Sequence, residues 1–184
     1  MALTSGINVN GDKPFEEKDF TKPNLAYFEH IRKGIRLAGE KGLLVGMAPV
    51  WKGCCNDFWN PVILENGTGK CREYGRFIGK YFAGCTNLFW IQGGDNDPKE
   101  QTDHYREIAI GIRESMPDVL QTYHASTGHS STNVLPNMTK NQILSIYSIS
   151  TILSASNRSD HWQNPHGRNC RELWLPLPIM DMNS

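Results

Sequence analysis

The chain has 184 residues, of which 39% are hydrophobic, and its 19 Lys and Arg balance 19 Asp and Glu. This length fits one domain that buries roughly 70% of its unfolded surface, and zero net charge gives no reason to expect nucleic acid or an acidic membrane as a partner. No segment reaches the roughly 18 apolar residues of a membrane-spanning helix, and five irregularly spaced cysteines indicate neither a disulfide framework nor a zinc site.

Short apolar segments alternate with amphipathic ones through the first two thirds of the chain. In chain order, strands are expected at residues 7–10, 43–49, 87–92 and 119–126, and helices at residues 24–40, 70–82 and 98–116. Gly42 is the predicted stop of the first helix, and the polar segment 52–69 is expected to be a long surface loop. The alternation predicts right-handed βαβ units and therefore an α/β fold with a parallel sheet.

The third predicted strand leads into a carboxylate. Gly93 and Gly94 permit a sharp exit from the strand, and Asp95 follows directly. Asp97 fits the N-cap of the next helix, with Pro98 at the first helical position. We therefore expect Asp95 on a rigid corner at the carboxyl end of a strand, where ligands and catalytic groups collect in parallel α/β folds.

The predicted strand ends place several polar and aromatic side chains on one rim of the sheet. They are Asn8, Asn10, Trp51, Asp95 and His124. Indoles stack on sugar faces, amides and carboxylates bind hydroxyl groups, and an acid can protonate a glycosidic oxygen, so this set suits a sugar. A plainer interpretation stands beside it: a turn carboxylate, a hydrogen-bonded core histidine and an indole that covers the rim.

Other motifs give weaker signals. Residues 93–97 offer oxygen ligands but lack the twelve-residue calcium loop, and no glycine-rich phosphate loop is present. Ser126 to Ser131 is rich in hydroxyls without a nucleophile elbow. His124 and His129 would hold a metal only with partners that the sequence does not reveal. We therefore expect no metal and no cofactor.

Four stretches of the chain resemble a known family, in order and with compatible spacing. They are residues 8–15, 22–30, 40–51, and 74–79 joined to 90–98 and 122–124. These stretches resemble the apiosidase-like glycoside hydrolases, TIM-barrel enzymes that act on plant cell-wall polysaccharide, over about residues 6–132. The resemblance implies a partial (β/α)8 barrel, with residues 1–132 as a catalytic domain and residues 133–184 as a divergent tail.

The resemblance also implies a mechanism. Asp95 matches the family's acid/base, and a second carboxylate about 5–5.5 Å away would attack the anomeric carbon with retention. Asn10, Asp12, Trp51 and His124 are then candidates for contacts with the sugar. The family's nucleophile lies in an Asp-Gly-Glu context, of which the only echo is residues 178–183, where Asn183 takes the place of the glutamate and cannot act as a carboxylate.

Two departures from the family lead to further expectations. A (β/α)8 barrel needs about 250 residues and eight strands, so we expect an incomplete gene product, with a frameshift near residue 133. Its open sheet edges would favour self-association. The first residues lack a secretion signal, whereas full-length members are expected to be secreted or periplasmic, so the localisation is not predicted.

Three interpretations follow, and the first leads. It is a glycoside hydrolase catalytic domain, incomplete in this chain, whose partner is a carbohydrate. The alternative is a non-catalytic carbohydrate-binding or interaction protein built on the same barrel half. A small doubly wound α/β protein with an unrelated ligand ranks last, because the tail shows no good covering helix.

Overall fold

The computed structural model describes residues 2–4, 6–53, 59–135 and 138. With η for a 3-10 helix, the elements are η1 (Glu16–Lys18), α1 (Leu25–Glu40), β1 (Val45–Met47), α2 (Trp59–Phe82), β2 (Leu88–Gly93), η2 (Lys99–Gln101), α3 (Thr102–Ser115), β3 (Gln121–His124) and α4 (Ser131–Val134). None of the described helices is long and apolar enough to cross a membrane.

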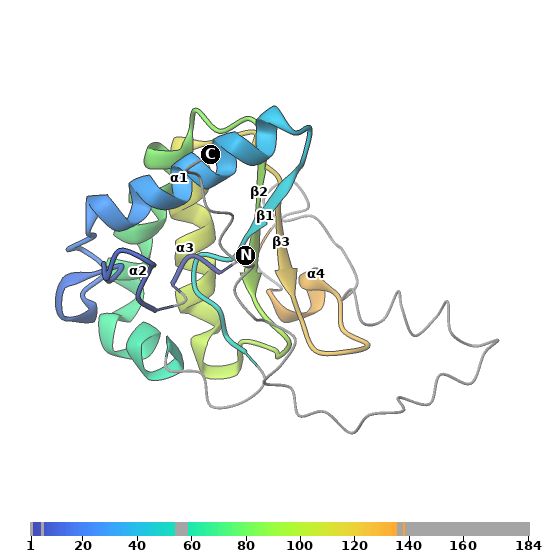
Figure 1. Cartoon of the computed structure of the whole chain (residues 1–184). Helices are drawn as coiled ribbons and strands as arrows, with labels where there is room; N and C mark the ends of the chain where they lie inside the picture. The colour runs from blue at the N-terminus through green and yellow to red at the C-terminus, as the bar shows by residue number, and fades with distance from the viewer. Residues whose placement is uncertain (1, 5, 54–58, 136–137, 139–184) are drawn as a thin grey trace, which may run out of the picture.

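The three strands form one parallel sheet in the order β1-β2-β3. Helices α1, α2 and α3 lie on one side of this sheet (Figure 1). Parallel neighbours need a crossover between them, and here each crossover contains a helix. The α/β class and the parallel pairing predicted from the alternation are confirmed.

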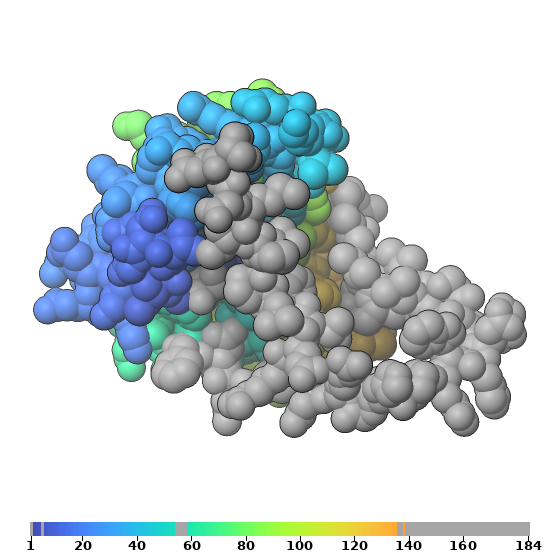
Figure 2. Space-filling view, viewed as in Figure 1, coloured from blue at the N-terminus to red at the C-terminus, as the bar shows by residue number. Residues whose placement is uncertain are grey.

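Aromatic side chains join the sheet to the helices. Trp90 of β2 is fully buried, and its ring centroid lies 5.9 Å from that of Phe82 in α2. Tyr123 of β3 meets Tyr105 of α3 at 5.6 Å. Because side chains alternate along a strand, this face of the sheet carries the core. In the space-filling view, the N-terminal loop and α1 form a continuous blue surface on the left of the molecule (Figure 2).

Helices α2 and α3 pack with their backbones in contact. A Cβ atom added at Gly75 would lie 2.3 Å from the carbonyl oxygen of Ile108, and one added at Gly111 would lie 2.3 Å from that of Arg72. The Arg72 guanidinium also bonds Glu107 at 2.6 Å, across the same interface. The two glycines therefore set the spacing between these helices.

Residues 7–10 form a turn, so the predicted strand there is wrong. Asn8 Oδ1 accepts the N–H groups of Asn10 and Asp12 at 2.9 Å, which satisfies the backbone locally. Ala2 instead forms an isolated parallel bridge to Ala48, the residue after β1. Ile7 and Val9 are exposed, so the alternating apolar side chains do not mark the buried face of a strand.

The predicted loop over residues 52–69 is also wrong in part. Residues 54–58 lie outside the described part, but α2 begins at Trp59 and continues to Phe82. Its early turns are buried through Val62 and Ile63, and a non-helical residue, Gly67 (φ 68°), breaks the regular geometry. Its polar residues and Pro61 interrupt the apolar period, so periodicity alone did not predict this part of the helix.

The remaining boundaries agree more closely with expectation. Helix α1 starts after Asn24, whose Oδ1 accepts the Ala26 N–H at 3.1 Å, and ends before Gly42. Strand β3 is shorter than the predicted 119–126 segment. The predicted tail from residue 139 onward lies outside the described residues, and the self-association expected from open edges stays a prediction.

Candidate active site

Trp51, Asp95 and His124 meet at the carboxyl edge of the sheet. Trp51 forms a parallel bridge with Gly93 beyond β1, Asp95 stands two residues after β2, and His124 ends β3. The indole and imidazole centroids lie 5.9 Å apart, and His124 Nε2 lies 3.6 Å from Asp95 Oδ1. The structure thus brings together three of the five side chains predicted to carry the function.

The Asp95 carboxylate is open to a ligand. Its side chain is 41% exposed, whereas that of His124 is 18% exposed. A separation of 3.6 Å is too long for a hydrogen bond, so the two groups interact through charge when the imidazole is protonated. No hydrogen bond to this carboxylate comes from the described residues, which leaves its oxygens available to a substrate.

The backbone at this corner explains why two glycines precede the acid. Gly93 and Gly94 have positive φ (71° and 150°). A Cβ at Gly93 would lie 2.2 Å from the Tyr123 ring, and one at Gly94 would lie 2.7 Å from the Trp51 ring. Asp95 also has a positive φ of 47°, which is uncommon outside glycine and which clusters at functional sites.

Three supports of this corner carry no signal in the sequence. The Asn96 amide donates to the Gly53 carbonyl at 2.7 Å, and the Tyr123 hydroxyl donates to the Asn96 carbonyl at 3.0 Å. Lys52, 6% exposed, donates from Nζ to Gln101 Oε1. Burial lowers the pKa of Lys52, and the nearby Glu100 opposes this. In the sequence, these three residues stand out only as the chain neighbours of Trp51, Asp95 and His124.

Asp97 does not cap α3, so that prediction is wrong. Its Oδ1 accepts the Ser126 N–H at 3.0 Å, its N–H donates to Ser126 Oγ at 3.0 Å, and its Oδ2 lies 2.6 Å from His129 Nδ1. Burial opposes the charge, but the bonds from Ser126 and His129 outweigh it and lower the pKa of Asp97. The carboxylate therefore joins two loops, and α3 follows η2 without a side-chain cap.

Asn10 and Asp12 lie in the N-terminal turn, apart from the three rim residues. Asn10 is exposed, and Asp12 Oδ2 accepts from the Asn8 amide at 3.0 Å. Neither lines the cavity described next, although Lys13, the following residue, does. Their predicted contact with sugar stays a prediction.

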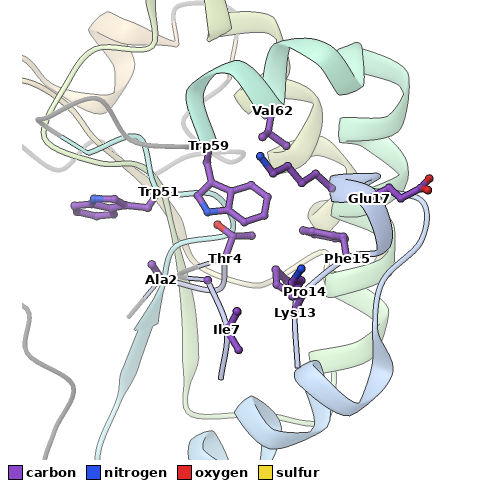
Figure 3. A pocket seen from close by; sticks show the side chains of 12 residues that line it. Ala2, Thr4, Ile7, Lys13, Pro14, Phe15, Glu17, Trp51, Trp59 and Val62 are labelled. Carbon is purple, nitrogen blue, oxygen red and sulfur yellow. The ribbon is translucent and has the colours of Figure 1, made fainter. Parts of the chain in front are cut away.

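A cavity of about 820 Å³ lies beside Trp51. Trp51 and Phe15 flank Trp59 in its lining, which the N-terminal segment completes (Figure 3). Thr4 lies in the same lining; it is fully buried, and its hydroxyl has no hydrogen-bond partner in the described part. This volume suits a small ligand, and Trp51 links the cavity to Asp95. The sequence analysis missed Trp59 because segment 52–69 was assigned to a loop, and Phe15, in the N-terminal segment, gave no functional signal.

Potential metal ligands and cysteines add no further functional group to the described part of the site. Among the described residues, no three His, Cys, Asp or Glu side chains gather closely enough to hold a metal ion. Cys71 and Cys85 are free and buried, and burial raises the pKa of Cys71 to about 12. The other three cysteines lie outside the described residues.

Comparisons with known proteins identify the family of the chain. A family described as apiosidase-like, catalytic domain, matches residues 2–181. That span exceeds the residues 6–132 over which the sequence resemblance was drawn, and the division at residue 133 stays a prediction. No curated protein matches the chain.

Two solved structures are similar in fold. One is a glycoside hydrolase family 5 protein from Bacteroides vulgatus, and the other is described as a glycoside hydrolase. Each is 22% identical with a TM-score of 0.58, and each match covers 74% of this chain. The chain spans about a third of their length, because the matches cover 30% and 31% of them. The likeness concerns the fold and confirms a partial barrel.

Proposed function

The chain belongs to the family of apiosidase-like catalytic domains, and from this premise we propose that Asp95 is the acid/base of a retaining glycoside hydrolase. The proposed substrate is a side chain of a plant cell-wall polysaccharide. The observation that carries the proposal is the exposed Asp95 carboxylate, held at a strand end beside Trp51 and His124.

The proposed reaction has two steps. In the first, the Asp95 carboxyl group gives its proton to the glycosidic oxygen as the bond to the anomeric carbon breaks, and a second carboxylate attacks that carbon. In the second, the Asp95 carboxylate takes a proton from water, which displaces the carboxylate nucleophile and releases the sugar with retention. The Asp95 carboxylate must reach the glycosidic oxygen in the first step and the water in the second, and its exposure permits both contacts.

The proposal assigns no nucleophile among the described residues. Asp97, the carboxylate nearest to Asp95 along the chain, is already bonded to Ser126 and His129. The sequence echo at residues 178–183 lies outside the described part. The nucleophile therefore stays unassigned.

Binding of the reacting sugar is proposed at Trp51. Its indole lies between the cavity and the His124 imidazole, so a sugar stacked on it would reach Asp95. His124 is proposed to bind a hydroxyl of that sugar, and Asn10 and Asp12 to contact it from the N-terminal turn.

An Asp95→Asn variant tests the acid/base role. With an alkyl apioside, we expect kcat/KM to fall about 10²–10⁴-fold, the usual contribution of general acid–base catalysis. With 4-nitrophenyl apioside, the bond-breaking step should fall far less, because nitrophenolate leaves without a proton. Asp118→Asn is the control, since this exposed aspartate precedes β3 at the opposite edge of the sheet. Equal losses on both substrates would contradict the assignment.

The second candidate is a carbohydrate-binding protein without turnover. It is favoured by the indole-lined cavity together with the unassigned nucleophile. In that case the wild-type chain hydrolyses neither apioside, and Asp95→Asn keeps the wild-type affinity for sugar.

A further inference from the structure

A second, smaller pocket lies on the other side of Asp95 from the cavity. Its volume is about 270 Å³. Its polar lining is Asp97, Lys99, Thr102, His129 and Asn133, from the segments that follow β2 and β3. The cavity beside Trp51 is lined by the N-terminal segment, the exit of β1 and the start of α2. Since the strand order is β1-β2-β3, the two hollows flank Asp95.

The pocket is formed before any ligand binds. The reciprocal bonds between Asp97 and Ser126, both 3.0 Å, join the loop after β2 to the loop after β3. The 2.6 Å contact between Asp97 Oδ2 and His129 Nδ1 orients the imidazole. His129 Nε2, at the far edge of a side chain that is 53% exposed, has no bond within the described part. A preformed site loses less entropy on binding.

The lining matches the chemistry of sugar hydroxyls. Hydroxyls donate and accept, and the pocket offers a carboxylate, an ammonium, an imidazole, a hydroxyl and an amide. The negative Asp97 offsets the positive Lys99, and the other polar groups of the lining are a hydroxyl, an amide and an imidazole bonded to Asp97, which favours an uncharged ligand over phosphate. Lys99 also holds a positive φ of 49°, a strain that clusters at ligand sites.

The spacing relates this pocket to the reacting bond. Asp97 lies two residues beyond Asp95, and an extended chain advances at most about 3.6 Å per residue. The two Cα atoms therefore lie within about 7 Å, which is comparable to one sugar ring with its linkage. We propose that the Asp97–His129 pocket binds an uncharged sugar unit adjoining the unit that reacts at Asp95. This inference rests on the proposed function.

Calorimetric titration of the full chain tests it with two probes. One is free D-apiose, and the other is a set of neutral oligosaccharides from partly hydrolysed plant cell-wall polysaccharide. We expect His129→Ala to weaken oligosaccharide binding about tenfold, the effect of losing one good hydrogen bond, without changing the affinity for apiose. Asn133→Ala should act in the same direction while leaving the Asp97–His129 contact intact. His30→Ala, an exposed histidine on α1, should change neither affinity.

The outcomes separate this inference from the function on which it rests. If the wild-type chain binds both probes but the two pocket variants bind oligosaccharide as the wild type does, the pocket assignment fails and the site at Trp51 stands. If they lose affinity for both probes equally, the pocket assignment also fails. If the wild-type chain binds neither probe, the proposed function falls first and the pocket with it. Inorganic phosphate that shifts the NMR signals of His129 at millimolar concentration would overturn the choice of an uncharged ligand.

Discussion

Replacing Gly111 by alanine sets two effects against each other. Alanine is the better helix former by about 1 kcal/mol, so α3 alone would gain stability. In the folded chain, however, the new methyl would lie 2.3 Å from the Arg72 carbonyl oxygen and 2.8 Å from the Arg76 nitrogen. Both are backbone atoms of α2, which cannot rotate away as a side chain could.

The size of the clash decides which effect wins. An ordinary contact begins near 3.4 Å, so helices α2 and α3 must move apart locally by about 1 Å. A gap of 0.5–1 Å forfeits a quarter to a half of the contact energy of each facing atom pair, and overpacking costs about 1–3 kcal/mol. After the helix gain of about 1 kcal/mol is subtracted, we expect Gly111→Ala to lower the free energy of unfolding by up to about 2 kcal/mol.

Urea unfolding followed by circular dichroism measures this change. Gly34→Ala is the matched control, because Gly34 lies in α1 and an added Cβ meets no atom within 4 Å. That variant should gain about 0.5–1 kcal/mol from helix propensity alone. If Gly111→Ala is as stable as Gly34→Ala, the claim that the α2 and α3 backbones are in close contact at Gly111 is wrong.

Two more predictions concern the candidate site. Gly94→Ala puts a methyl 2.7 Å from the Trp51 ring and should reduce the affinity for D-apiose. The control is Gly128→Ala, at a position whose φ is also positive but where an added Cβ meets no atom within 4 Å, so it should lower stability without changing that affinity. Equal affinities of the two variants for D-apiose would refute the role of the Trp51 ring in binding. Asp97→Asn should lower the free energy of unfolding at pH 7 by about 1.5 kcal/mol, the value of a charged hydrogen bond. The pKa of Asp97 in the folded chain lies below the usual 3.8. The stabilisation by the ionised carboxylate is therefore fully present above about pH 4 and is lost as the pH falls through the folded pKa. The gap between wild type and variant in urea titrations should therefore shrink below about pH 4, and a constant gap would contradict the ionised bond.

The sequence located the elements whose signals are local. The apolar period of α1, its Asn24 cap and its Gly42 stop all lie within one segment, and the structure agrees with each of them. The apolar run ending at Gly93 predicted β2 and the corner at Asp95 for the same reason. Periodicity failed at residues 7–10, where the alternating Ile7 and Val9 are exposed, and at the start of α2, where the Trp59 ring packs against Phe15 and Phe20 from a distant part of the chain.

By itself, the sequence determined the alternation of strands and helices, and with it the parallel sheet whose edge carries Trp51, Asp95 and His124. Only the tertiary structure decided the partners: Asp97 binds His129 rather than its own helix, and Lys52 binds Gln101, 49 residues away. The reason is physical. Periodicity and caps depend on backbone geometry within a few residues, whereas a long-range bond depends on which loops the packed core brings together.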